Sequence, residues 1–356
     1  MNITLKQTRW GIALVVLVCL FVFGLEATPQ AGKAAPRPKG VPTFEVDPSW
    51  PKTKPDNWVW GQADVLGINA DVRDNHVWVT TRGQIAEFDP SGNLLQVWSA
   101  RGEGNNKWTT IHGLFLDRNN FIWTTGREQH QVLKWTRDGK LVLAIGKFNE
   151  TAGSNDQEKM GRPAEVYVAA DTNEVFVADG YTNRRVVVFD GQTGKYLRHW
   201  GAYGKPPDDA ARNRIETNDS TPPPQYNIPH GITGSRDGLI YLADRTNSRV
   251  QVFKRNGEFV KECVTRPGSG GAFSVALSHD PEQEFVYVPD GTQHRIWIIR
   301  RSSMEVVGQF AHEGRGPGEL GRPHNITVDG MGNIYVAEAD PGRRAQKFTF
   351  KGWSAP

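Results

Sequence analysis

The sequence predicts an all-β protein folded as a β-propeller of six blades. Short runs of alternating or continuous apolar residues recur along the chain, and Asp-Gly or Asn-Gly turns separate them. From Ile232 to Val260 such runs supply about four antiparallel strands, which is the content of one blade. The pattern starts again at intervals of 43 to 66 residues, a spacing that fits blades with variable loops, near Gly67, Gly113, Glu165, Gly231, Ser274 and Asn325.

The last repeat lacks its outermost strand. It ends at residues 348–350, and only a short stub follows. The segment Thr43–Asp47 precedes the first repeat and is the natural donor of the missing strand, because closing the ring with the other terminus removes an exposed sheet edge. We therefore expect a propeller over residues 43–352 that an N-terminal strand closes.

The N-terminus has the layout of an export signal. Lys6 and Arg9 precede the apolar run Trp10–Leu25, and small and polar residues follow it. The sixteen residues of this run are fewer than the ~20 of a typical membrane span. Because no clean A-x-A cleavage site is present, residues 1–31 are predicted to be a signal peptide or an uncleaved membrane anchor of a periplasmic or extracellular protein. Residues 32–42, rich in Pro, Lys, Gly and Ala, are predicted to be a disordered linker.

Charge and cysteine content narrow the range of functions. The formal net charge is +3 over 356 residues, and no block of Lys and Arg stands out, which argues against a nucleic-acid partner. Once Cys19 is removed with the signal segment, Cys263 is the only cysteine, so no disulfide within the chain can form. The predicted fold must therefore be stabilised by packing.

Three histidines occupy the same position in alternate repeats. His112, His230 and His324 each stand at the start of the innermost strand in the second, fourth and sixth units. Alternate blades of a six-fold ring are related by about 120°, so the three imidazoles should point together into the central channel. Three histidines with an open fourth position are the ligand set of a catalytic zinc ion. For any one of them alone, a polar residue that caps a strand is the competing interpretation.

The intervening units have apolar residues at this position, and the remaining histidines share no register with it. The apolar residues are Leu66, Ala164 and Phe273. The remaining histidines are expected at the surface or in turns: His76, His130, His199, His279, His294 and His312.

A second set of polar residues is predicted at the same end of the channel. In an antiparallel sheet the start of the first strand and the end of the second lie at one face, which places Arg82 and Tyr181 over the channel. A guanidinium can bind a carboxylate in bidentate fashion, and a phenol can act as a base. Structural roles are expected for aspartates that recur at second-strand ends and for two Asn and Arg pairs that follow them: Asp179, Asp244, Asp290, Asn183, Arg185, Asn247 and Arg249.

The segments 177–186 and 242–250 resemble NHL repeats. Beyond them, Val41–Phe350 resembles the peptidyl-α-hydroxyglycine α-amidating lyase (peptidylamidoglycolate lyase) family, whose six-bladed propeller binds zinc through three histidines in motifs similar to those of His112, His230 and His324. The functional arginine and tyrosine of that family match Arg82 and Tyr181. The resemblance implies a zinc-dependent carbon–nitrogen lyase that splits a C-terminal α-hydroxyglycine into an amide and glyoxylate. Tyr181 would accept the hydroxyl proton, and Arg82 would anchor or polarise the substrate.

The chain departs from the family pattern at several positions. Family members also hold a structural calcium ion, and the matching positions are the backbone carbonyls of Val65 and Leu114 and the side chain of Asn325. Asn325 replaces an aspartate, so it supplies an oxygen but no charge. Arg322 replaces a methionine and places a cation beside the predicted zinc site, where it could bind substrate. Thr182 stands where the family has a disulfide cysteine.

Two other classes of function compete with a lyase. One is an exported, non-catalytic NHL-repeat propeller that binds a protein or glycan partner, with any metal serving structure alone. The other is a calcium-dependent, lactonase-like hydrolase, but that class needs carboxylate and amide ligands in the channel, where this chain has histidines. For the lyase, the expected substrate is a peptide or a small molecule with a C-terminal α-hydroxyglycine-like group, such as a ureidoglycolate-like compound. Contact with a membrane is expected only through the N-terminal segment.

Overall fold

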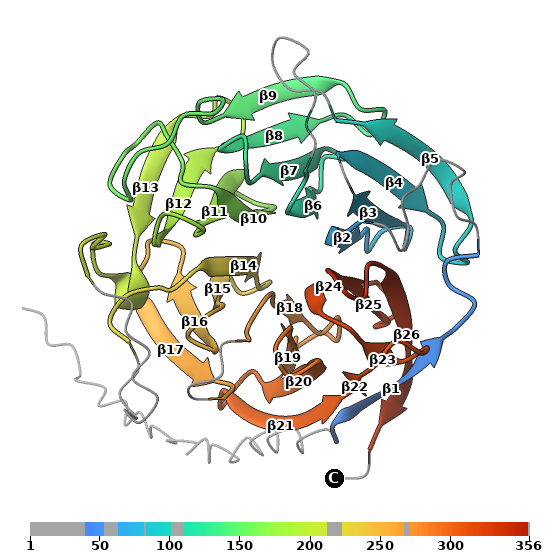
Figure 1. The fold of residues 1–356 in the computed structure, drawn as a ribbon. Helices are drawn as coiled ribbons and strands as arrows, with labels where there is room; N and C mark the ends of the chain where they lie inside the picture. Colours follow the sequence, from blue (N-terminus) through green and yellow to red (C-terminus); the bar gives the residue numbers. More distant parts are fainter. Residues whose placement is uncertain are drawn as a thin grey trace, which may run out of the picture. The chain divides into compact units, whose positions relative to one another are not determined.

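Six four-stranded antiparallel sheets surround a central channel in the computed structural model (Figure 1). The structure describes residues 40–52, 63–81, 83–100, 108, 110–211, 223–266 and 271–354. The predicted signal segment 1–31 and most of the predicted linker lie outside these residues. Within them, the predicted all-β propeller of six blades is confirmed.

Each blade runs from an innermost strand at the channel to an outermost strand at the rim (Figure 1). In that order the strands are β2 (Val65–Ala70), β3 (Val77–Thr81), β4 (Gln84–Phe88) and β5 (Leu94–Ser99) in blade 1; β6 (Leu114–Leu116), β7 (Ile122–Gly126), β8 (Gln131–Trp135) and β9 (Leu141–Ile145) in blade 2; β10 (Pro163–Val168), β11 (Glu174–Asp179), β12 (Arg185–Asp190) and β13 (Tyr196–Trp200) in blade 3; β14 (Pro229–Gly234), β15 (Leu239–Asp244), β16 (Arg249–Lys254) and β17 (Phe259–Val264) in blade 4; β18 (Ala276–Leu277), β19 (Phe285–Asp290), β20 (Arg295–Arg300) and β21 (Glu305–Phe310) in blade 5; and β24 (Pro323–Val328), β25 (Ile334–Glu338), β26 (Ala345–Trp353) and β1 (Pro42–Asp47) in blade 6.

Three short elements lie outside the blades. The strands β22 (His312–Glu313) and β23 (Glu319–Leu320) pair in parallel, and the 3-10 turn η2 spans Ala202–Gly204. Among the residues that the structure describes, none of the helices has the length and apolar character that crossing a membrane requires.

The hydrophobic core is divided into slices between neighbouring blades. Between blades 3 and 4, for example, Ala178 and Val188 pack in one cluster with Ile240 and Leu242. Middle strands such as β12 are therefore covered on both faces and consist of continuous β-branched and aromatic residues, whereas the rim strand β21 is largely exposed. This packing explains why the middle strands are the clearest apolar runs in the sequence.

Recurring aspartates at the ends of second strands hold the turns together, as predicted. The fully buried Asp179 carboxylate accepts hydrogen bonds from the Gly161 backbone N–H at 2.7 Å, Asn183 Nδ2 at 2.8 Å and Arg185 Nε at 2.8 Å. In blade 4 an equivalent set joins the Asp244 carboxylate to the Asn227 N–H, Asn247 Nδ2 and Arg249 Nε. Each carboxylate thus ties the loop that enters its blade to the turn between the second and third strands.

The N-terminal strand closes the ring, which confirms the prediction for Thr43–Asp47. Strand β1 pairs antiparallel with β26, from Pro42 opposite Trp353 to Asp47 opposite Lys347. The Phe44 ring lies 4.9 Å from the Phe310 ring of blade 5 and 5.9 Å from the Phe350 ring of blade 6, measured between centroids. Closure therefore rests on packing across two blades as well as on strand pairing.

Replacing the closing aromatic side chain should destabilise the protein. We expect Phe44→Ala to lower the free energy of unfolding by about 2 kcal/mol, because it removes a partly buried ring from the junction of blades 5 and 6. Glu45→Ala at the exposed neighbouring position is the control, since the surface ion pair of Glu45 with Lys351 should contribute less than about 1 kcal/mol to the free energy of unfolding. Urea unfolding followed by tryptophan fluorescence measures both, and equal losses for the two variants would contradict this role of Phe44.

Candidate metal centre

Three imidazoles from alternate blades meet in the channel. His230 and His324 are in the innermost strands β14 and β24, and His112 lies two residues before β6. Their ring centroids are 4.7 to 4.9 Å apart, and one ring nitrogen of each lies within 4.8 Å of the others. All three side chains are buried. The arrangement has the size and composition of a three-histidine metal site.

Blades without a channel histidine orient the rings of the blades that have one. The Nδ1 atoms of His112, His230 and His324 lie 2.8, 2.5 and 2.9 Å from backbone carbonyl oxygens. Those carbonyls belong to the residues at the equivalent position of the intervening blades, Ala164, Phe273 and Leu66 respectively. Because a carbonyl only accepts hydrogen bonds, each Nδ1 carries the proton and each Nε2 keeps its lone pair. These carbonyls are the kind of outer partner that fixes metal-binding histidines in proteins.

Burial keeps these imidazoles neutral. Removal from water lowers the pKa of His112 and His230 well below the usual range, and lowers the pKa of His324 to about 3. Positive neighbours, among them Arg245, add to the effect. Neutral imidazole is the form that binds a metal ion, so the protonation state and the orientation of the rings both fit zinc.

Tyr181 lies directly beside the three histidines. Its hydroxyl oxygen is 2.9 Å from His112 Nε2 and 3.1 Å from His230 Nε2, and it accepts a hydrogen bond of 3.2 Å from Arg245 Nη1. The preceding Gly180 allows this placement, because a Cβ atom there would lie only 1.8 Å from the Pro229 carbonyl oxygen. The turn after β11 can therefore pack against blade 4 and carry the phenol to the channel.

His112 and His324 line a cavity of about 620 Å³ at this end of the channel. Four arginines line it, Arg127, Arg245, Arg322 and Arg343, together with the carboxylates of Asp64 and Asp340. The guanidinium carbon of Arg245 is 4.0 Å from the centre of the Phe273 ring, and that of Arg127 is 4.8 Å from the centre of the Tyr181 ring. Aromatic faces thus hold two of the four cations in place.

The cavity contains two of the sequence-predicted polar residues and several that were not predicted. Tyr181 and Arg322 line the cavity. Arg82 follows the last residue of β3 and lies outside the described residues, so its role stays a prediction. Arg127 and Arg245 were missed, although each follows the second strand of its blade, as Arg82 does. The position directly after a second strand, which these arginines share with Arg82, could have identified them from the sequence. The other six histidines are at least partly exposed and lie outside the channel group.

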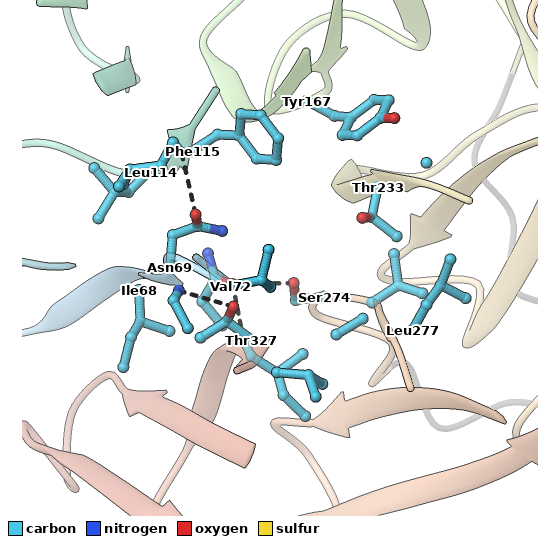
Figure 2. A pocket seen from close by; sticks show the side chains of 18 of the residues that line it. Ile68, Asn69, Val72, Leu114, Phe115, Tyr167, Thr233, Ser274, Leu277 and Thr327 are labelled. Carbon is cyan, nitrogen blue, oxygen red and sulfur yellow. Dashed lines mark hydrogen bonds between the residues drawn. The ribbon is translucent and has the colours of Figure 1, made fainter. Parts of the chain in front are cut away.

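The inner strands begin near the three channel histidines and end at a second cavity of about 350 Å³. Figure 2 shows Asn69, Leu114, Ser274 and Thr327 around this cavity. The hydroxyl of Thr327 accepts a hydrogen bond of 3.0 Å from the Ala70 N–H, and Asn69 Oδ1 accepts one of 3.1 Å from the Leu116 N–H. These contacts join adjacent blades at this end of the channel.

Two of the positions implied for calcium, Leu114 and Asn325, line this second cavity together with the buried carboxyl group of Glu165. Asn325 Oδ1 accepts hydrogen bonds from the Ile326 N–H at 2.7 Å and from Ser274 Oγ at 3.2 Å, while Asn325 Nδ2 donates to Glu165 Oε2. Glu165 Oε1 accepts from the Leu114 N–H at 3.0 Å. Calcium requires six to eight oxygen ligands, and here an amide nitrogen faces the carboxyl group. Calcium at Val65, Leu114 and Asn325 stays a prediction, which this donor arrangement does not favour.

The buried Glu165 should make stability depend on pH. Burial raises the pKa of Glu165 from 4.5 to about 8, against hydrogen bonds from Val166, Asn325 and Leu114 that lower it. The unfolded state ionises first, so this group's contribution to stability is complete below about pH 4.5 and is lost as the pH rises to about 8. We therefore expect the wild type to lose up to about 5 kcal/mol of its free energy of unfolding relative to Glu165→Gln over this window. The comparison is made against the variant because the lowered pKa values of the three buried histidines make the stability of both proteins rise as the pH approaches 6.5.

Urea unfolding in EDTA at several pH values measures this difference, with the exposed Glu158→Gln as control. Profiles of the wild type and of Glu165→Gln that run parallel would contradict the assignment to Glu165. The same titration with added calcium separates the two interpretations of the site. Stabilisation of the wild type by calcium at pH 8.5, absent in Glu165→Gln, would show that a cation binds between the strands.

The chain is a six-bladed β-propeller, and one segment of it matches a known repeat family. The NHL repeat family matches residues 226–253, which begin just before β14 of blade 4 and continue into β16. A solved streptogramin B lyase structure aligns with a TM-score of 0.55 over 87% of this chain and 98% of that one, at 14% identity. At that identity the likeness concerns the fold alone.

Similarity to curated proteins in sequence is more specific than similarity in fold. The chain is 28% identical over 325 residues to peptidyl-alpha-hydroxyglycine alpha-amidating lyase 1 of Drosophila melanogaster, covering 84% of this chain and 54% of that protein. It is 28% identical to peptidylglycine alpha-amidating monooxygenase of Rattus norvegicus, covering 94% of this chain and 36% of that protein, and 26% identical to NHL repeat-containing protein 3 of Mus musculus, covering 86% and 84%. The distant relationship to amidating lyases that the motifs predicted is thus confirmed. The chain spans about a quarter to a half of the length of the amidating monooxygenases and of the Drosophila lyase 1 that it matches.

Proposed function

We propose that this protein is an exported zinc-dependent lyase that cleaves the N–C bond of a C-terminal α-hydroxyglycine group and releases an amide and glyoxylate. The observation that carries the proposal is the placement of the Tyr181 hydroxyl within hydrogen-bond distance of the Nε2 atoms of two neutral channel histidines. The relationship to proteins named amidating lyases supports the reaction type. Export is proposed from the apolar run Trp10–Leu25.

His112, His230 and His324 would hold the zinc ion through Nε2. A bound zinc ion supplies a Lewis acid that favours loss of the proton from the substrate hydroxyl. The three backbone carbonyls hold the Nδ1 protons and so leave the Nε2 lone pairs available for a metal ion, and the low pKa of the imidazoles keeps those lone pairs free of protons. The protein's contribution at this point would be an oriented and neutral set of donors.

Tyr181 is the proposed proton acceptor. In the reaction the hydroxyl loses its proton, a C=O bond forms at that carbon, and the N–C bond breaks with its electron pair on nitrogen. The nitrogen then takes up one proton and becomes the amide, so Tyr181 can return the proton it accepted. Arg245 donates a hydrogen bond to the Tyr181 oxygen at 3.2 Å, which stabilises negative charge on that oxygen.

Arg245 is the proposed anchor of the glyoxylate carboxylate, since its guanidinium packs on the Phe273 ring and hydrogen-bonds Tyr181. Arg322, which also lines the cavity, is a further proposed substrate-binding residue. For Arg82, the proposed role in anchoring or polarising the substrate rests on the motif resemblance alone. A guanidinium suits this task because its paired N–H groups match the two carboxylate oxygens.

The direct test is to measure bound metal and glyoxylate release from an N-acyl-α-hydroxyglycine peptide. The expected result is one zinc ion per chain and glyoxylate formation that a chelator abolishes and added zinc restores. Protein that is active without metal, or zinc-loaded protein that releases no glyoxylate from peptide or small-molecule substrates, would overturn the proposal.

One observation favours a second candidate function. NHL repeat-containing protein 3 is matched over 84% of its length, and its name refers only to the repeats. A non-catalytic propeller that binds a partner outside the cytoplasm would account for that match. This alternative predicts that binding of a partner survives loss of any single channel histidine. A lactonase-like hydrolase finds less support, because histidines rather than carboxylates form the channel group.

A further inference from the structure

The substrate cavity has more positive charge than one carboxylate needs. Within the described part of the chain, four guanidinium groups line it against two carboxylates, Asp64 and Asp340, which leaves an excess of two positive charges before any metal binds. Asp340 already pairs with Arg343 at 2.9 Å, and Asp64 Oδ1 accepts a hydrogen bond from the Asp340 backbone N–H. Neither carboxylate therefore neutralises the arginines nearest the histidines.

The arginines of the cavity differ in the partners available to them. Among the residues that the structure describes, Arg245 and Arg322 have no ion pair. Arg127 pairs at 2.8 Å with Glu128, but Glu128 also binds Arg162 and so serves two guanidiniums at once. The cavity wall thus holds two unpaired cations and one that shares its carboxylate.

The positions of these cations divide them into two groups. Arg245 hydrogen-bonds Tyr181 and is close to the reacting end of the proposed substrate. Arg322 is exposed and lies two residues before His324 in the chain. Arg127 stacks on the face of the Tyr181 ring. All three residues line the same cavity. Burial lowers the pKa of Arg245, Tyr181 opposes this, and repulsion from Arg322 and Arg127 lowers it further. Like charges that line one cavity favour the binding of an anion among them.

We propose that the physiological substrate carries a second anionic group, and that Arg127 and Arg322 bind it. This inference rests on the proposed function for the α-hydroxyglycine end of the substrate. Its carboxylate would be anchored near the histidines, with Arg245 beside Tyr181, and the acyl part would bear a second carboxylate directed to Arg127 and Arg322. The substrate class is then a small dianionic N-acyl-α-hydroxyglycine, rather than a peptide with neutral neighbouring residues.

A pair of unreactive ligands that differ by one carboxylate tests the proposed second anionic group without any turnover. N-benzoylglycine has one carboxylate and N-(4-carboxybenzoyl)glycine has two, and both lack the hydroxyl that the lyase reaction needs. Isothermal titration of the zinc-loaded protein at low salt should show about tenfold tighter binding of the dicarboxylate. Arg127→Gln and Arg322→Gln should each reduce that advantage to about threefold or less, while the affinity for the monocarboxylate changes little.

Arg315→Gln is the matched control, because it removes one positive charge from an exposed position outside the cavity and should keep the tenfold preference. Equal affinity for the two ligands would overturn the proposal, and so would a preference that persists in both cavity variants. Glyoxylate release is measured separately. A failed lyase assay with a retained dicarboxylate preference would refute the proposed reaction alone, and the reverse outcome would refute the second anionic group alone.

Discussion

His230→Ala is expected to lose bound metal and glyoxylate release together. The substitution removes one of three Nε2 donors that lie within 4.8 Å of one another, and two histidines alone hold zinc poorly. Without the ion the substrate hydroxyl loses a stabilisation of several kcal/mol, so the rate should fall by a factor of about 1000 or more. Metal content by atomic emission and initial rates of glyoxylate formation measure the two effects on the same sample.

The exposed His312 offers a control on an imidazole outside the channel, and His312→Ala should keep both metal and activity. His230 is buried and bonded to Phe273, so the variant's fold must be checked by circular dichroism. His230→Asn, which fills more of the space, serves as a second variant. A folded His230 variant with full zinc content and unchanged glyoxylate release would contradict the metal centre.

Tyr181→Phe is expected to retain the metal and lose most of the turnover. The ring stays in place between Arg127 and the histidines, but the oxygen that lies 2.9 Å from His112 Nε2 is removed. Loss of a positioned proton acceptor typically lowers kcat by a factor of about 100 to 10,000. Because the phenol is not one of the three proposed ligands, zinc content should stay at one ion per chain.

Tyr203→Phe is the matched control for this variant. Tyr203 also lies near an arginine, since its hydroxyl accepts a hydrogen bond of 2.8 Å from Arg249 Nη1, but it is remote from the channel histidines. Its removal should affect stability alone. If Tyr181→Phe kept kcat within a few-fold of the wild type, the phenol would not be the proton acceptor, whatever the metal content.

The fold was predictable because each level of the sequence points to the same structure. Apolar runs, Asp-Gly turns and the spacing of the repeats all specify blades, and the incomplete last repeat identifies Thr43–Asp47 as the closing strand, which β1 confirms. The positions of His112, His230 and His324 followed from the same register, since a repeat places equivalent residues at equivalent points around the ring. Tyr181 was found through the end of its second strand.

Contacts between blades were not predictable from the pattern. Arg127 and Arg245 stand at strand ends like that of Arg82, but only their packing on Tyr181 and Phe273 shows that they reach the cavity. Glu165 appeared only as the start of a repeat, and its burial against Asn325 changes the interpretation of the calcium positions. These side chains are long and flexible, so their direction depends on neighbours far away in sequence.

The six-bladed ring, its closure and the placement of the three channel histidines follow from the sequence, because periodic patterns and turn residues act locally and repeat. Which ring nitrogen of each histidine is free depends on tertiary contacts. That choice depends on the carbonyls of Leu66, Ala164 and Phe273, which meet the rings across blade boundaries. The tertiary structure likewise gathered the arginines into one positively charged cavity. Hydrogen bonds and charges of this kind join residues from different repeats, and no single repeat contains both partners.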